Sequence, residues 1–117
     1  MIPRRAMFGA PLLIAGPARA HSELRSSEPA NGARLTSPPE MLTLRFNEGV
    51  WLTAVTLHDE AGRSVRLPLS RDITPRPIEQ LAAPALGTGA WRLEWRAISA
   101  DGHPVRGTIR FTIAPMP

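Results

Sequence analysis

The sequence predicts an all-β protein of about seven short strands. Apolar and polar residues alternate along several stretches, most clearly from Trp91 to Ala97 and from Val105 to Ile113. Thirteen prolines and nine glycines in 117 residues are typical of short elements joined by turns. Beyond the first 20 residues no stretch sustains a helical apolar stripe. One polar face per strand favours a two-sheet sandwich or a small Greek-key barrel.

The N-terminus has the three-part order of a secretory signal peptide. Residues 1–5 are basic, residues 6–18 are largely apolar, and Ala18-Arg19-Ala20 has the small-x-small cleavage pattern. The apolar run is shorter than the roughly 20 residues that span a bilayer. We therefore expect residues 1–20 to be removed and residues 21–117 to form one domain without a membrane span. An uncleaved anchor or a disordered tail is the alternative, and Arg4-Arg5 leaves the export route open between Sec and twin-arginine.

The first half of the mature chain contains two expected strands before its centre. Residues 21–27 form the first strand, closed by the turn cluster of residues 28–32. Ser37-Pro38-Pro39 is a second break, because proline cannot donate to a strand ladder. The second strand covers residues 41–46, in which leucine and phenylalanine alternate with threonine and arginine.

Alternation resumes in residues 51–57, which predict the third strand, followed by a turn at residues 59–62. Residues 64–69 form a short strand and residues 78–83 a weak one, with a proline-containing surface connection between them. The last two strands are the alternating stretches named above. Their outward arginines are interpreted as solvated surface. Trp51, Trp91 and Trp95 are expected to fill the space between the sheets.

Charge and cysteine content exclude several classes of protein. Three of the 14 basic residues lie in the leader, so 11 remain against 10 acidic residues. This near balance, with the arginines scattered singly, argues against binding to nucleic acid. No cysteine is present, so neither a disulfide framework nor a thiolate metal site is available.

Three residues form a candidate copper site. Cleavage after Ala20 makes His21 the N-terminal residue, which offers an amine and an imidazole together. Asp101 and His103 flank Gly102 in a turn between strands, and their i, i+2 spacing in an extended turn places both side chains on one side. Nitrogen and oxygen ligands suit Cu(II). An ordinary loop histidine at His103 is the alternative, and His58 is interpreted as a surface residue.

Four segments of the mature chain form one pattern: His21-Ser-Glu-Leu, Ser27-Glu-Pro-Ala-Asn-Gly, Leu44-Arg-Phe-Asn-Glu48 and Trp95-Arg-Ala-Ile-Ser-Ala-Asp-Gly-His-Pro with Gly107. The most specific part is Trp-Arg-x-x-Ser-x-Asp-x-His-Pro. With these segments the mature chain resembles the CopC family of periplasmic copper-resistance proteins.

This resemblance implies an immunoglobulin-like Greek-key β-sandwich that binds one Cu(II) through His21, Asp101 and His103. Glu48 is then expected in the outer shell, where it orients a ligand. Some family members also hold Cu(I) in a methionine-rich loop. Here the mature chain has only Met41, expected in the core, and Met116 in the tail, so a Cu(II)-only site is expected.

These observations predict a monomeric, non-enzymatic copper carrier or buffer in the periplasm, able to pass copper to an inner-membrane importer. Two other functions stay open. A histidine at the N-terminus also occurs in copper-dependent monooxygenases, although this chain is short, lacks tyrosine and offers an equatorial carboxylate. The other open function is a β-sandwich module that takes part in protein interactions and binds no metal.

Overall fold

The computed structural model describes residues 22–115, and the regular structure of this range consists only of strands. The all-β prediction is confirmed. The strands in order are β1 (Leu24–Glu28), β2 (Ala33–Leu35), β3 (Met41–Asp59), β4 (Ser64–Arg66), β5 (Arg76–Ala82), β6 (Gly89–Ser99) and β7 (Pro104–Ile113).

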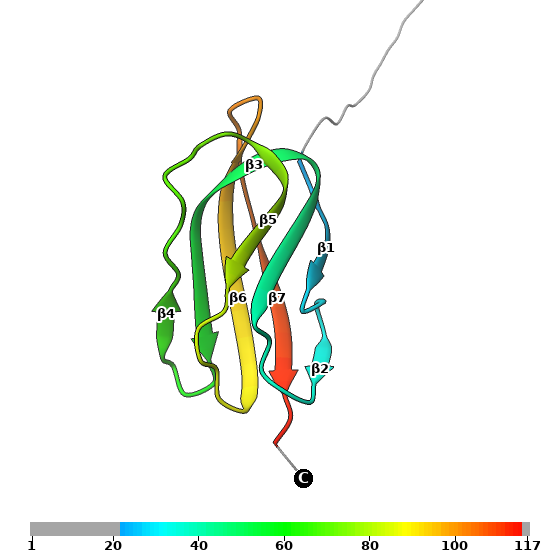
Figure 1. Cartoon of the computed structure of the whole chain (residues 1–117), viewed down its shortest axis with the longest axis vertical. Coiled ribbons are helices and arrows are strands. Elements are labelled where there is room, and N and C mark those ends of the chain that lie inside the picture. Colours follow the sequence, from blue (N-terminus) through cyan, green and yellow to red (C-terminus); the bar gives the residue numbers. More distant parts are fainter. Residues whose placement is uncertain (1–21, 116–117) are drawn as a thin grey trace, which may run out of the picture.

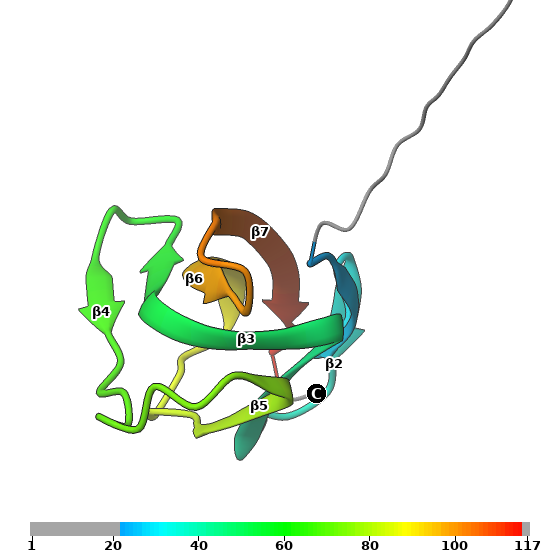
Figure 2. The same ribbon diagram turned by 90° about the horizontal axis from the view of Figure 1, so that it is seen from above.

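Strand β3 belongs to both layers of the molecule. Its first part pairs antiparallel with β1 and with β5, whereas residues 51–59 pair with β6 and β4. Val50, at the change of layer, pairs with both Arg76 of β5 and Ser99 of β6. β7 adds to β6 antiparallel, and β2 adds to β7 in parallel. Figure 2 shows β5 and β7 on opposite sides of the bent β3. The ladder is continuous because β3 changes layer at residues 47–49, the way sandwich corners are made. The predicted sandwich is confirmed.

The core lies between the layers and follows the predicted alternation. Trp91 and Trp95 are buried, and Trp95 meets the ring of Phe46 edge to face with centroids 5.1 Å apart. The buried apolar residues are Leu42, Leu44, Phe46, Val50, Val55, Leu57, Leu67, Leu86, Trp91, Leu93, Trp95, Ala97, Ile109, Phe111 and Ile113.

The structure corrects the expectation for Trp51, which is only half-buried. The pairing of β3 with β6 shifts between Leu52 and Ala54, so Thr53 is an extra residue without a cross-strand partner. One inserted residue reverses the inward and outward alternation. For this reason Trp51 does not share the face of Val55.

Met41 was expected in the core and is 45% exposed, so this prediction was wrong. The alternation that buries Leu42 places its neighbour on the opposite face. The expected strands at residues 41–46 and 51–57 are parts of one strand, and β2 was not predicted because a three-residue edge strand carries too short a pattern.

Candidate metal centre

The β6–β7 hairpin presents Asp101 and His103 at one end of the sandwich. Ser99 and His103 close it, with the Ser99 N–H donating to the His103 carbonyl at 2.8 Å. The Gly102 N–H donates to the Ser99 carbonyl, also at 2.8 Å. Gly102 has φ +90°, a conformation that glycine adopts without strain. The backbone therefore defines the positions of the residues on either side of Gly102.

The side chains of Asp101 and His103 are in direct contact. Nδ1 of His103 lies 3.0 Å from Oδ2 of Asp101, and both residues are exposed. The predicted juxtaposition of the carboxylate and the imidazole is thus present. It provides one oxygen-donor group and one nitrogen-donor group, the combination that suits Cu(II).

Buried Ser99 supports both residues, a role that the sequence analysis missed. Its hydroxyl donates to Oδ1 of Asp101 and accepts the backbone N–H of His103 at 3.1 Å. The serine belongs to the segment that carries the family resemblance, but spacing alone did not reveal its two hydrogen bonds. Through these two hydrogen bonds Ser99 restrains the side chain of Asp101 and the backbone of His103.

Hydrogen bonds favour the ionised form of the Asp101 carboxyl. The Ser99 hydroxyl and then the His103 side chain lower the pKa of Asp101 below its ordinary value, because both stabilise the charged form. A deprotonated carboxylate is the form that binds a metal.

The bend of β3 connects the beginning of the described chain with this hairpin. The Asn47 N–H donates to the Glu23 carbonyl at 3.0 Å, and Oδ1 of Asn47 accepts the Glu23 N–H at 2.6 Å. Two residues later, the Gly49 carbonyl accepts the Ala100 N–H at 3.2 Å. Figure 1 shows the start of β1 and the β6–β7 hairpin at the same end of the molecule. Glu48 is exposed between these two attachments.

A hollow of about 440 Å³ separates residues 22–24 from residues 105–108 of β7. Ser22 Oγ and Trp95 Nε1, from two residues that line it, are buried and have no hydrogen-bond partner within residues 22–115. Buried polar atoms normally have a partner. The hollow therefore suits a further polar group beside the hairpin.

The described residues include only part of the predicted ligand set. Asp101 and His103 are brought together, Glu48 lies at the bend that joins their hairpin to the first described residues, and His21 lies outside the described residues. Within residues 22–115 no three His, Cys, Asp or Glu side chains form a group that could hold a metal ion. His58 is elsewhere, on β3, where its ring contacts Ser64 at 2.7 Å and Glu94 at 2.9 Å.

The model of the CopC domain matches residues 24–114. The chain belongs to the CopC domain family. The recognition made from the sequence is confirmed, and the match spans β1 to β7.

Known proteins of this family are similar along most of the chain. Copper resistance protein C of Pseudomonas syringae pv. tomato is 28% identical over 116 residues, which cover 92% of this chain and 91% of that protein. The crystal structure of CopC from Methylosinus trichosporium OB3b has a TM-score of 0.71 at 28% identity, and the match covers 83% of this chain and 97% of that one.

One relative is much longer than the segment that matches this chain. Copper transport protein CutJ of Bacillus subtilis is 31% identical over 99 residues, which are 80% of this chain but 18% of that protein. The names of these relatives describe resistance and transport, as expected for a non-enzymatic protein. Residues 22–115 contain no helix long and apolar enough to cross a membrane.

Proposed function

We propose that this protein is a periplasmic copper(II) carrier or buffer that serves copper homeostasis or resistance. The leader of residues 1–20 directs export and is cut after Ala20. The remaining domain binds one Cu(II) ion as cargo. The observation that carries this proposal is the double attachment at the β3 bend, where Asn47 bonds Glu23 and Gly49 bonds Ala100.

The proposed ligands are the amine and imidazole of His21, the carboxylate of Asp101 and the imidazole of His103. His21 is two residues before Glu23, so the bend leaves only a short stretch of chain between the attachment and the terminal amine. Asp101 and His103 supply the other donors from a hairpin bonded to the same bend. Glu48 belongs to the outer shell, where it orients a ligand.

A site for Cu(II) alone fits the position of Met41. Thioethers favour Cu(I), but Met41 begins β3 six residues before Asn47, about 20 Å along an extended strand. Met116 lies outside the described residues. Nitrogen and oxygen donors then bind the ion, and no methionine takes part.

A carrier needs a recipient, and an inner-membrane copper importer is the proposed one. The match to part of a protein named a copper transport protein supports this coupling, since there a similar segment belongs to a longer chain.

Copper titration of two purified forms tests the proposal. One form begins at His21, and the other carries a single extra residue before it. We expect one Cu(II) per chain in the first form, with nitrogen hyperfine splitting in its electron paramagnetic resonance spectrum. The extension should weaken binding by more than the roughly 10–100-fold typical of outer-shell changes. Equal affinity of the two forms would exclude the amine as a ligand.

His103→Ala and His58→Ala form a matched pair for the same titration. His103→Ala should abolish tight binding, whereas His58→Ala should retain it because the His58 ring is occupied by Ser64 and Glu94. Unchanged affinity in His103→Ala would remove the hairpin from the site.

A further inference from the structure

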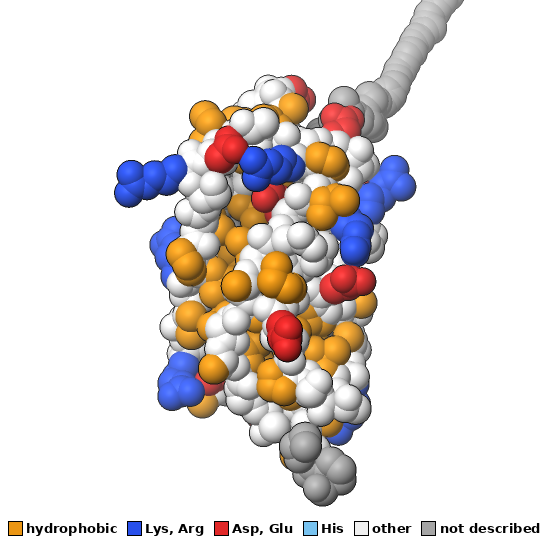
Figure 3. Space-filling model, in the orientation of Figure 1, with side chains coloured by type: hydrophobic (Ala, Val, Ile, Leu, Met, Phe, Trp, Pro, Cys, Tyr) orange, Lys and Arg blue, Asp and Glu red, His pale blue; other side chains and the backbone are white. Residues whose placement is uncertain are grey.

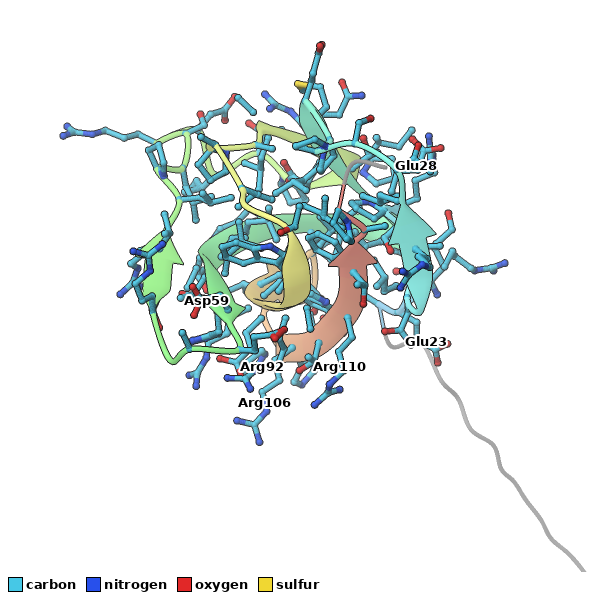
Figure 4. All side chains as sticks on the ribbon, turned by 90° about the horizontal axis from the view of Figure 1, so that it is seen from below. Glu23, Glu28, Asp59, Arg92, Arg106 and Arg110 are labelled. Atoms are coloured by element: carbon cyan, nitrogen blue, oxygen red, sulfur yellow. The ribbon has the colours of Figure 1, made fainter. Side chains whose placement is uncertain are left out.

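The outer face of the β4–β3–β6–β7 layer concentrates positive charge. Arg92 lies directly opposite Arg110, and Arg96 lies directly opposite Arg106, in the β6–β7 ladder. Arg66 of β4 lies opposite Thr56 on the same face. Figure 4 shows Arg92, Arg106 and Arg110 projecting from one side of the molecule. We call these five residues the arginine face.

The arginine face is poorly neutralised. Glu94 is the carboxylate among these rows, and it contacts His58 at 2.9 Å and Arg92 at 3.4 Å. The other four arginines form no ion pair with any residue of the described chain. Residues 22–115 hold 11 arginines and 10 acidic residues, so this face departs strongly from the near balance of the domain.

Stability alone does not explain this arrangement. Like charges directly opposite each other in an antiparallel ladder are destabilising, and this ladder contains two such pairs. A threonine or glutamate at either position would relieve the repulsion. Among the six other arginines of residues 22–115, three are paired with acids: Arg45 with Glu28, Arg63 with Asp59 and Arg76 with Asp72.

The arginine face is also hollowed. A groove of about 630 Å³ runs over it, lined by Arg66, Arg96 and Arg106 together with Thr56 and Thr108. Glu94 also lines the groove, where its carboxylate contacts the ring of His58. The opposite side of the molecule, shown in Figure 3, has apolar side chains at its centre and most charges towards its margins. A concave cationic groove fits a protruding chain better than it fits a flat membrane surface.

We propose that the arginine face docks an acidic segment of a partner protein, with carboxylates of that segment bound by Arg66, Arg96 and Arg106. Guanidinium groups bind carboxylates in two-point geometry, and a charged groove accelerates association with an oppositely charged partner. The groove reaches Arg106, three residues beyond His103 and so about 10 Å along β7 from that residue. This proposal does not depend on the metal site.

The test uses fluorescence anisotropy with a labelled, N-acetylated octaglutamate. We expect binding at about 20 mM salt that weakens at about 0.15 M, where the Debye length is about 8 Å. Arg96→Glu/Arg106→Glu should weaken binding by about tenfold or more. Arg96→Gln/Arg106→Gln, a milder change, should give a smaller loss in the same direction, and circular dichroism verifies that each variant is folded.

Arg25→Glu/Arg71→Glu is the matched control, since it reverses the same number of exposed charges away from the groove. We expect it to lose distinctly less affinity than the groove variant, and no more than about twofold at about 0.15 M salt, because charges beyond a Debye length of about 8 Å are largely screened there. Equal losses of affinity in the two double variants would overturn the proposal, because binding would then depend on the net charge of the domain and not on the groove. Absence of octaglutamate binding would also overturn it.

Two further probes separate the sources of negative charge. Phosphatidylglycerol vesicles that bind more tightly than octaglutamate, with the same dependence on Arg96 and Arg106, would replace the protein partner with a membrane. If inorganic phosphate displaced octaglutamate at a concentration similar to that of the peptide, the groove would be a site for small anions and not for a protein segment. Weak vesicle binding and weak phosphate competition are the expected results.

Discussion

The indole of Trp95 lies directly against the backbone of Gly107, its cross-strand partner in the β6–β7 ladder. A Cβ atom at Gly107 would stand 2.7 Å from Cζ2 of Trp95 and 2.9 Å from its Nε1. Real side chains do not tolerate such contacts, so the absence of a side chain at position 107 is what lets the tryptophan fill the core. The same indole borders the hollow beside residues 22–24.

Gly107→Ala should destabilise the domain by about 1–3 kcal/mol, the typical cost of overpacking a core. Trp95 cannot move away freely because Phe46 contacts its ring. Urea denaturation measures the loss. Gly87→Ala is the control, since nothing lies within 4 Å of a Cβ at Gly87, and it should be close to neutral. Equal stability of the two variants would contradict the packing described for Trp95.

Trp95→Ala should cost roughly 3–5 kcal/mol of unfolding free energy, because a buried aromatic ring leaves a cavity. Trp51→Ala should cost distinctly less, since the bulge in β3 leaves Trp51 half-buried. Thermal and urea unfolding of the two variants compare these costs. A larger loss in Trp51→Ala would show that the bulge does not remove this residue from the core.

Asp59 should contribute to the loss of folding stability at acidic pH. The backbone N–H of Arg63 is the largest cause that lowers its pKa, aided by the Arg63 side chain and the Ala61 N–H. A lowered folded pKa means that the stabilisation is fully present above the ordinary value of 3.8 and is lost as pH falls through the folded pKa.

Asp59→Asn should therefore lower stability at neutral pH and flatten its dependence on pH below about 4. Urea midpoints at a series of pH values provide the measurement. A parallel shift of the whole profile, with unchanged slope, would mean that Asp59 does not contribute through its charge.

Ser99→Ala should weaken Cu(II) binding by about 10–100-fold, as outer-shell changes do, because the hydroxyl holds both Asp101 and the backbone of His103. Ser27→Ala is the control: it removes another buried hydroxyl, bonded to the Pro29 carbonyl, from a strand that does not form the hairpin. Both variants should lose some stability, and only Ser99→Ala should lose copper affinity. Equal copper affinity would assign Ser99 a purely structural role.

Local pattern was sufficient to predict most of the fold. Alternation in β6 and β7 predicted the inward faces correctly, because a strand that is buried on one side must repeat every second residue. It failed at Trp51, where one extra residue reverses the alternation. At Met41 the alternation itself, continued back from buried Leu42, gives the exposed face, and the expectation of a core methionine did not follow it. A bulge is determined by pairing with a distant strand, which a local pattern does not contain.

The candidate site divides in the same way. The sequence by itself determined which donor groups are available. These are a carboxylate and an imidazole two residues apart in a turn, and a histidine at an expected cleavage junction. Only the tertiary structure decided that Ser99 orients the hairpin, that Asn47 and Gly49 attach the chain start and the hairpin to one bend, and that isolated arginines align into one face. Residue identity is a local property of the chain, whereas hydrogen bonds and cross-strand register join residues that are far apart in sequence, and folding alone brings these together.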